Sequence, residues 1–548
     1  MASIHFQNGT IIPASWLNDV NDAVYTQLPV VIAKQSQWVS VKDFGAVGDG
    51  VTDDTAAIKS TFASLPTGGT VYFPFGTYLV SSQININPNT IVVGNNSTIS
   101  APTTGYHVFN ATGSLQVGNL KFTRNPVAQN TTWKAINCDY AVQVLPAGTN
   151  IVVQNCSITN FDIGVYCDGG QPRAISYAEV SGCTIIINTL GTGGNTSVRP
   201  TVNLNNCNQA IIQNNPLLDA SDRVNEVNNI YCIGCGSIIV QNNYIYSGCQ
   251  KVVTDSYSST NATDQVVITG NRHYQITWWF VGADKSPIHS VDISDNYFDT
   301  LIPSGSGGAI NLGSYTSNLT TGDSVRFASV QGNYFVNVPK NVHFISLSAG
   351  NSFGTLLLNN NKYYNTSTQS SGTYAIVNYN NAGTTYRSLI CSNEDVLGNS
   401  NTRAYLQNGN PFANTQLVNI NEVGITGQKT GYQSGSFTAT LVGCTTSPTA
   451  TVSYSVVGGL VTINIPTLQA TSNSTSCSLT GLPVAIQPQS QIVNTPLFIQ
   501  DNGVYSIGQM QINPASGTIT LQKNGVTAGW TASGSKGTWS TTVTYLLT

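Results

Sequence analysis

The feature that most constrains the fold of this 548-residue chain is a repeat between about residues 84 and 425. Each copy has an alternating strand pattern, a turn containing Asn, and then an aromatic or aliphatic residue. Three steps are each 28 residues long: Asn215 to Asn243, Asn243 to Asn271, and Asn333 to Asn361. A period of about 20–50 residues indicates stacked units that cannot bury their apolar faces alone. Several short strands in each unit predict a β-helix solenoid.

The recurring Asn predicts how the units are joined. Further copies of the turn contain Asn155, Asn296 and Asn393. Asn tolerates the left-handed conformation and hydrogen-bonds neighbouring backbone. We therefore expect these residues to occupy left-handed turn positions and to form a ladder along the solenoid.

Composition excludes several function classes. Charged residues make up only 8% of the chain, about a third of the usual share of about 25%. A net charge of −4 without a run of Lys or Arg argues against nucleic-acid binding. No stretch approaches the ~18 apolar residues of a membrane span. The N-terminus also lacks the basic and apolar segments of a secretion signal. We therefore expect no membrane insertion.

The eleven cysteines are spread widely, and several fall in apparent strands. Cys232 and Cys235 form a C-x-x-C pair, but no second pair or nearby His completes a zinc site. We therefore expect buried free thiols, no metal site and no cofactor.

Residues 38–80 carry the most distinctive local pattern, WVSVKDFGAVGDGVTDDTAAIKSTFASLPTGGTVYFPFGTYLV. Thr52 is predicted to cap a short helix with Asp53 and Asp54 in its first turn. Ala57, Ile58 and Phe62 have helical spacing, and the period then changes to two, which predicts a strand pair.

The strings DFGAVGDG-x-TDDTAAI and GGTVYFPFGTY resemble the opening of pectate-lyase-like right-handed β-helix proteins. With the short helical pattern SWLNDVNDAVY before them, they resemble a bacteriophage tailspike. The resemblance implies that residues 38–80 cap the solenoid. It also implies a homotrimer in the virion, assembled in the host cytoplasm and acting outside the cell on a bacterial surface polysaccharide.

The predicted fold class is all-β, with three parts. Residues 1–36 form a short helical segment, which by resemblance attaches to the virion or to other phage tail proteins. Residues 37–429 form the right-handed parallel β-helix with its cap. Residues 430–548 change to antiparallel signals, with hairpins expected at Gly458-Gly459 and Asn524-Gly525. They predict a β-sandwich. By resemblance to the C-terminal modules of tailspikes, it would support trimerisation or bind carbohydrate, and a folding and capping domain is the alternative.

A glycoside hydrolase needs two carboxylates, an acid and a base or nucleophile. Asp255 lies twelve residues after Asn243, and Asp284 thirteen after Asn271, so both are expected to end the next strand on adjacent rungs. Neighbouring strands are about 4.8 Å apart, which would place the carboxylates at about 5 Å, near the spacing of retaining enzymes. Turn capping is the alternative role for Asp at a strand end.

The densest acidic stretch, LLDASDRVNEVNN, offers Asp222 and Glu226 in a long loop, where function often resides. Two rungs from this loop to Asp284 would give about 9–10 Å, near the upper limit of inverting enzymes. Five residues nearby are candidate sugar contacts: Trp278, Trp279, Tyr257, Arg223 and Lys285.

His273 takes the inward position of its turn and is expected to be a core residue. Were it a base, it would join Lys285 and Tyr257 in a polysaccharide lyase, since β-elimination needs such a base near a uronate. Hydrolysis is the first prediction, a lyase is the second, and a non-enzymatic protein that binds glycan for adsorption is the third.

Overall fold

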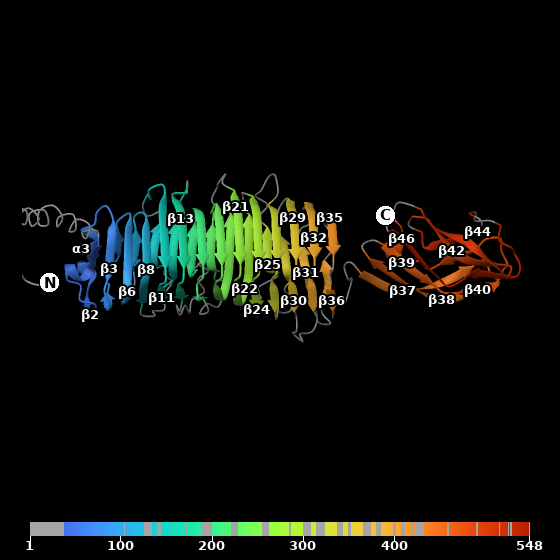
Figure 1. The fold of residues 1–548 in the computed structure, drawn as a ribbon, viewed down its shortest axis with the longest axis horizontal. Coiled ribbons are helices and arrows are strands. Elements are labelled where there is room, and N and C mark those ends of the chain that lie inside the picture. The colour runs from blue at the N-terminus through green and yellow to red at the C-terminus, as the bar shows by residue number, and fades with distance from the viewer. Residues whose placement is uncertain are drawn as a thin grey trace, which may run out of the picture. The chain divides into compact units, whose positions relative to one another are not determined.

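The fold was obtained as a computed structural model (Figure 1). It describes residues 38–102, 105–124, 134–139, 144–170, 173–187, 200–220, 228–254, 262–283, 287–299, 308–313, 324–336, 343–348, 352–364, 374–379, 385–397, 402–406, 412–418, 421–423, 432–457, 460–488, 492–514, 516–523, 525 and 529–546. The expected segment 1–36 lies outside this part of the chain. Within these ranges, no helix has the length and apolar character needed to cross a membrane.

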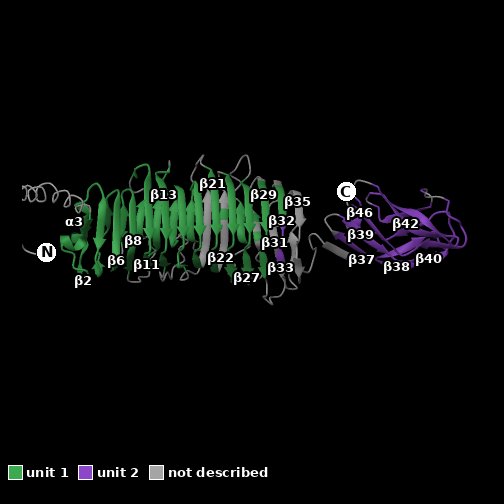
Figure 2. Ribbon diagram, viewed as in Figure 1, with its two compact units in different colours: residues 1–390, 408–415 green, residues 391–407, 416–548 purple. Residues whose placement is uncertain are grey.

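The chain divides into two compact units (Figure 2). Unit 1 comprises Met1–Ile390 and Asn408–Thr415, and unit 2 comprises Cys391–Gln407 and Gln416–Thr548.

Unit 1 is a parallel β-helix, as predicted. Each coil contributes one strand to each of three parallel sheets, and every strand pairs with its counterparts in neighbouring coils. Sheet I contains β1 (Trp38–Ser40), β3 (Gly69–Phe73), β10 (Thr149–Gln154), β13 (Ile175–Ser181), β16 (Cys207–Gln213), β19 (Ser237–Gln241), β21 (Thr263–Thr269), β23 (Ile288–Ser294), β26 (Val325–Gln331) and β29 (Ser352–Asn359). Sheet II contains β2 (Asp49–Asp53), β4 (Thr77–Leu79), β11 (Ser157–Thr159), β14 (Thr184–Ile186), β17 (Leu217–Asp219), β24 (Tyr297–Asp299), β27 (Tyr334–Val336) and β30 (Lys362–Tyr364).

Sheet III contains β5 (Ile84–Ile86), β7 (Phe109–Ala111), β9 (Lys134–Asp139), β12 (Ile163–Asp168), β15 (Val202–Asn205), β18 (Asn228–Ile233), β25 (Gly308–Gly313), β28 (His343–Ser348) and β31 (Tyr374–Tyr379). Four long strands turn a corner. These are β6 (Thr90–Ala101) and β8 (Leu115–Arg124) between sheets I and II, and β20 (Tyr244–Thr254) and β22 (Arg272–Ala283) between sheets II and III. The last parallel strands are β32 (Thr385–Ser392), β33 (Asp395–Leu397), β34 (Thr402–Leu406), β35 (Phe412–Val418) and β36 (Asn421–Val423), of which β33, β34 and β36 belong to unit 2.

A ladder of buried Asn side chains joins the coils at the turn between sheets I and II, as predicted. The backbone N–H and the Nδ2 of Asn271 both donate to Asn296 Oδ1, each at 3.0 Å, and Asn296 donates in the same way to Asn333. The side chain of Asn296 also donates to the carbonyl of Ile268 at 2.8 Å. The same pattern links Asn215, Asn243, Asn271, Asn296, Asn333 and Asn361.

The left-handed position, however, is the residue before each ladder Asn, so that part of the expectation is wrong. It is occupied by Asn214, Asn242, Gly270, Asp295, Gly332 and Asn360, with φ between 54° and 66°. Asn155 and Asn393 also have left-handed φ values, of 53° and 55°. The ladder position there therefore belongs to Cys156 and Glu394. The cysteine turns continue the ladder, because the Cys183 N–H donates to Asn215 Oδ1 at 2.8 Å.

An aromatic stack lies inside sheet II, directly under the turns. His273, Phe298, Phe335 and Tyr363 are buried and stacked, with successive ring centroids 4.6, 4.9 and 5.1 Å apart. His273 is therefore a core residue, as expected. Burial lowers its pKa to about 3, because the apolar stack disfavours the charged imidazolium.

The cap begins its helix later than predicted. Helix α3 spans Thr55–Ala63, after the short 3-10 helix η2 (Val41–Phe44), and its N-cap residue is Asp54 rather than Thr52. The Asp54 carboxylate makes no capping hydrogen bond to the helix. It accepts instead from the backbone N–H groups of Val47 at 2.6 Å and Gly48 at 3.1 Å, in the loop before the helix. Ile58 and Phe62 are buried, so α3 packs its apolar face onto the end of the solenoid.

The C-terminal part of unit 2 is an antiparallel module, as predicted. Its described strands form one sheet that curves around a common core, in the order β40-β45-β42-β43-β44-β41-β37-β38-β39-β46. Their bounds are β37 (Tyr432–Val442), β38 (Thr449–Val457), β39 (Leu460–Ile465), β40 (Leu468–Thr471), β41 (Ser478–Thr480), β42 (Val493–Asp501), β43 (Val504–Ile512), β44 (Thr518–Lys523), β45 (Ser535–Thr538) and β46 (Thr541–Leu546), and a 3-10 helix, η3 (Val484–Ile486), precedes β42.

Of the two expected hairpins, one is present. Strands β38 and β39 pair with Val457 opposite Leu460, around the predicted tip. The hairpin expected at Asn524-Gly525 is wrong, because β44 pairs with β41 and β43 instead. Trp530 is buried there and donates its indole N–H to the carbonyl of Leu521 at 3.2 Å, which explains the apolar residue that suggested a strand.

The ladder gives a stability prediction. Asn296→Ala leaves the N–H and one amide hydrogen of Asn271 without their acceptor in a buried site. It should cost about 2–5 kcal/mol, measured as a large fall in melting temperature. Asp295→Gly, at the adjacent exposed left-handed position, is the matched control and should change stability by less than about 0.5 kcal/mol. Equal effects would contradict the ladder's role.

The buried imidazole gives a prediction for acid stability. The folded-state pKa of His273 lies below its unfolded value of about 6.5, so its neutral form supports the fold above that pH. That stability is lost as pH falls from about 6.5 toward about 3, by at most about 1.4 kcal/mol per unit. His273→Phe should flatten the fall of melting temperature across this range, whereas His289→Gln, a more exposed histidine, should not. Unchanged acid sensitivity of His273→Phe would contradict the assignment.

Candidate functional site

The candidate residues chosen from sequence fall mainly outside the described part of the chain. This holds for Asp222, Arg223, Glu226, Asp255, Tyr257, Asp284 and Lys285. Trp278 and Trp279 lie in strand β22, in which the Cα register pairs Trp279 with Gln250.

The register describes only the residues that precede two of these candidates. Thr254 at the end of β20 pairs with Ala283 at the end of β22. Asp255 and Asp284 come next in the sequence but lie outside the described residues, so their adjacency stays a prediction. Both strands end one residue earlier than expected.

The acidic loop joins the sheet at the other edge. Segment 221–227 leads into β18 at Asn228, whereas segment 255–261 leaves β20 at Thr254. Because β18 and β20 are paired parallel strands, these two junctions lie at opposite ends of sheet III, about 17–20 Å apart for a six-residue strand. The expected two-rung spacing from Glu226 to Asp284 stays a prediction, because both residues lie outside the described part of the chain.

Sheet III does bring two carboxylates together among the described residues. Asp139 ends β9 and Asp168 ends β12, and the two are register partners. Their Cα atoms are therefore about 4.8 Å apart. Their neighbours Cys138 and Cys167 are buried in the core, so alternation directs both Asp side chains to the outer face.

A lysine and a tyrosine complete this group. Lys134 Nζ lies 3.6 Å from Asp139 Oδ2 and 3.3 Å from the centroid of the Tyr166 ring. The Tyr166 hydroxyl lies 3.5 Å from Asp168 Oδ2. Asp168 Oδ1 accepts from the N–H of Gly170 at 2.9 Å and from Asn206 Nδ2 at 2.8 Å. We call Lys134, Asp139, Tyr166, Asp168 and Asn206 the sheet III polar group.

The polar group is withdrawn from solvent although it faces outward. The side chains of Lys134 and Asp139 are only 8% and 12% exposed. Burial lowers the pKa of Lys134, against the opposing effect of Asp139. Burial also raises the pKa of Tyr166, assisted by Asp168 and Asp139. Such perturbed groups gathered on a recessed outer face are typical of sites that exchange protons.

A histidine adjoins the group. His107 Nδ1 accepts from the backbone N–H of Lys134 at 3.3 Å. Burial, together with Lys134 and Arg124, lowers the pKa of His107 to about 4. The imidazole is therefore neutral near pH 7 and can accept a hydrogen bond while Lys134 and Arg124 supply the positive field.

Sequence reasoning missed this pair, although a signal was present. The dipeptide Cys-Asp occurs at residues 138–139 and again at 167–168, a separation of 29 residues and close to one coil. A buried residue followed by an acid at the same place in consecutive coils predicts adjacent outward carboxylates. Asp168 follows the Asn155 turn, but the turn of the preceding coil, at Asn119, was not recognised, so registering coils on Asn did not align Asp139 with Asp168.

Comparisons with known proteins agree with the fold. Residues 38–125 match the family described as rhamnogalacturonase A/epimerase, pectate lyase-like. This match confirms the resemblance of residues 38–80 to pectate-lyase-like proteins and extends it through the first coils.

Curated relatives match a short stretch only. The pre-neck appendage protein of Bacillus phage phi29 is 48% identical over 56 residues, which is 10% of this chain and 6% of that protein. The mannuronan C5-epimerase AlgE5 of Azotobacter vinelandii is 48% identical over 64 residues, again 10% of this chain and 6% of that protein.

Solved structures are similar over a longer span with low identity. The tailspike protein of E. coli bacteriophage HK620, solved with a pentasaccharide, has a TM-score of 0.47 and 12% identity, covering 94% of each chain. The Dettilon tailspike protein (gp208) has a TM-score of 0.42 and 14% identity, covering 94% of this chain and 95% of that one.

Proposed function

We propose that this chain is a phage tailspike that binds and cleaves a bacterial surface polysaccharide, namely a capsule, an exopolysaccharide or an O-antigen. The observation that carries the proposal is the register-paired carboxylates Asp139 and Asp168, which stand beside Lys134 on a recessed outer face of the β-helix. The phage pre-neck appendage protein, the epimerase and the tailspikes among the similar proteins support the ligand class and the virion setting.

The geometry favours hydrolysis with retention. Register-paired Asp residues with Cα atoms about 4.8 Å apart can bring their carboxyl groups to the spacing of about 5–5.5 Å at which one carboxylate attacks the anomeric carbon. Asp168, oriented by the donors Gly170 and Asn206, is assigned as nucleophile. Asp139 is assigned as the acid that protonates the leaving oxygen and then activates the water that releases the sugar.

A polysaccharide lyase is the second candidate, because Lys134 could act as its base. β-Elimination needs a base near the proton beside a uronate carboxyl, and burial favours the neutral amine of Lys134. A glycan-binding adsorption protein that does not cleave is the third candidate.

The remaining assignments belong to the same proposal. Segment 1–36 attaches the chain to other tail proteins, residues 37–429 bind and cleave glycan, and residues 430–548 support a homotrimer or bind sugar. Asp255 and Asp284 form a second location for the chemistry, and Asp222 and Glu226 form a third. Sugar contacts there are Trp278, Trp279, Tyr257, Arg223 and Lys285.

Substitution of the carboxylates tests the proposal. On purified host polysaccharide, Asp139→Asn and Asp168→Asn should each reduce the release of new reducing ends by about 100-fold or more, since acid–base groups typically contribute 10²–10⁴-fold. Asp264→Asn, an exposed carboxylate on β21, is the matched control and should cleave like the wild type.

The outcomes separate the candidates. If Asp139→Asn and Asp168→Asn keep their activity while Asp255→Asn and Asp284→Asn lose cleavage, the active site is at the second location. Products that absorb as unsaturated uronates identify a lyase, and Lys134→Met should then abolish their formation. Adsorption without chain shortening refutes cleavage altogether.

A further inference from the structure

A row of exposed side chains on the outer face of sheet II has no role in the proposed chemistry. Register pairing aligns five residues on consecutive coils: Tyr244, Arg272, Tyr297, Tyr334 and Lys362. Each immediately precedes an inward residue of the core, from Ile245 to the aromatic stack, so alternation turns the row outward. We call these five residues the tyrosine strip.

The strip presents aromatic rings to solvent at a regular interval. Tyr244, Tyr297 and Tyr334 are 37%, 38% and 39% exposed. The rungs are about 4.8 Å apart, so the strip spans about 19 Å, close to the length of a short run of pyranose rings. A tyrosine offers a flat apolar face and a polar hydroxyl, which suits the apolar face and hydroxyl rim of a sugar.

The strip itself carries two basic side chains, whereas the neighbouring row carries Asp219 and Asp299 in register with Tyr246 and Tyr274. Arg272 is exposed and lies in register between Tyr244 and Tyr297. Lys362 ends the strip, with its Nζ 4.9 Å from the centroid of the Tyr334 ring. A guanidinium holds a carboxylate with two parallel hydrogen bonds, so Arg272 fits an acidic sugar between two rings.

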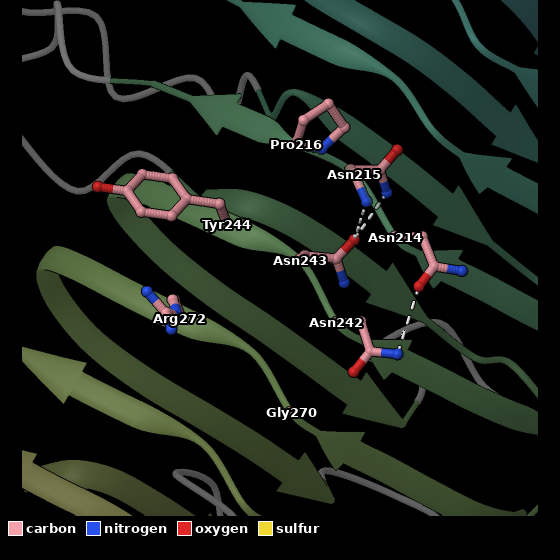
Figure 3. Close-up of a pocket in the computed structure, with 8 residues that line it drawn as sticks. All are labelled: Asn214, Asn215, Pro216, Asn242, Asn243, Tyr244, Gly270 and Arg272. Carbon is pink, nitrogen blue, oxygen red and sulfur yellow. Dashed lines mark hydrogen bonds between the residues drawn. The ribbon is translucent and has the colours of Figure 1, made fainter.

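A depression adjoins the strip at Tyr244 and Arg272 (Figure 3). Its volume is about 220 Å³, and its lining includes Asn214, Asn242, Pro216 and Gly270. Gly270 lacks a side chain at the left-handed position that carries Asn in the two preceding coils, and this contributes to the gap. The amides of Asn214 and Asn242, themselves joined at 3.3 Å, supply donors and acceptors beside the aromatic face.

A second row strengthens the same face. Two residues further along their strands, Tyr246 and Tyr274 stack with ring centroids 5.8 Å apart and an interplanar angle of 12°. These two tyrosines are therefore ordered against one another, and an ordered aromatic surface loses little entropy when a ligand binds.

We infer that the tyrosine strip is a glycan-binding surface distinct from the sheet III polar group, and that it binds a carboxylate-bearing polysaccharide along the coil axis. The inference rests on the proposed function for its class of ligand. The strip would hold a long chain, while cleavage occurs on sheet III.

Affinity electrophoresis of the whole protein tests this inference. Gels would contain polygalacturonate, alginate or carboxyl-reduced polygalacturonate at low salt. The wild type should be retarded by both acidic polymers and much less by the reduced one. Arg272→Gln and the double variant Tyr244→Ala/Tyr297→Ala should each weaken retardation about tenfold, as expected for one charged or stacked contact. Arg326→Gln, an exposed arginine on β26, is the matched control and should behave as the wild type.

Three results would overturn the inference: no retardation of the wild type in either acidic gel, equal retardation in all variants, or a changed oligomeric state of the tyrosine variant by light scattering, which would make the strip a subunit interface. The gel reports binding alone, so its result does not depend on whether Asp139 and Asp168 cleave. Failure of the proposed cleavage would leave strip-dependent binding intact, and the reverse also holds.

Discussion

The buried Asn ladder is the interaction on which the rest of the solenoid depends. At each turn an inward amide accepts from the N–H and Nδ2 of the preceding ladder Asn and donates to the next. A buried polar group without partners is expensive, so the ladder satisfies its members only when consecutive coils stand in one register. The aromatic stack beneath it adds packing in that same register. Coils of unequal length are therefore fixed at their turns, and their differences in length fall in the segments between strands.

Because the register between coils is fixed, residues at equivalent positions of successive coils form rows along the solenoid. Asp139 and Asp168 become neighbours because Cys138 and Cys167 are register partners in the core. Tyr244, Arg272 and Tyr297 align because Ile245, His273 and Phe298 do so beneath them. A parallel sheet thus presents its outer side chains about 4.8 Å apart, which suits a long repeating ligand better than a compact one. In the proposed function cleavage occurs on sheet III, and in the further inference the tyrosine strip binds the same polymer.

Much of the architecture could be predicted from the sequence, and the errors share one cause. The 28-residue steps predicted the coils, the ladder and the core role of His273. The alignment of the turns was one residue off at Asn155 and Asn393. Asn occurs at two adjacent turn positions, one left-handed and one inward, and the sequence alone did not distinguish them. Hydrogen bonds to other parts of the chain override local propensity in both remaining errors. The N-cap residue Asp54 accepts from the N–H of Val47, and the indole N–H of Trp530, beyond the false hairpin at Asn524-Gly525, donates to the carbonyl of Leu521.

The sequence by itself determined the repeating units, the cap and the change to antiparallel strands, because these follow from local periodicity and turn chemistry repeated many times. Only the tertiary structure decided which acids meet. Whether two carboxylates are neighbours depends on pairing between coils and on which edge of a sheet each loop joins. Those relations placed Asp139 beside Asp168, and put the junctions of segments 221–227 and 255–261 at opposite ends of sheet III. Adjacency across stacked coils is a non-local property, and it arises only when the strands of neighbouring coils pair in register.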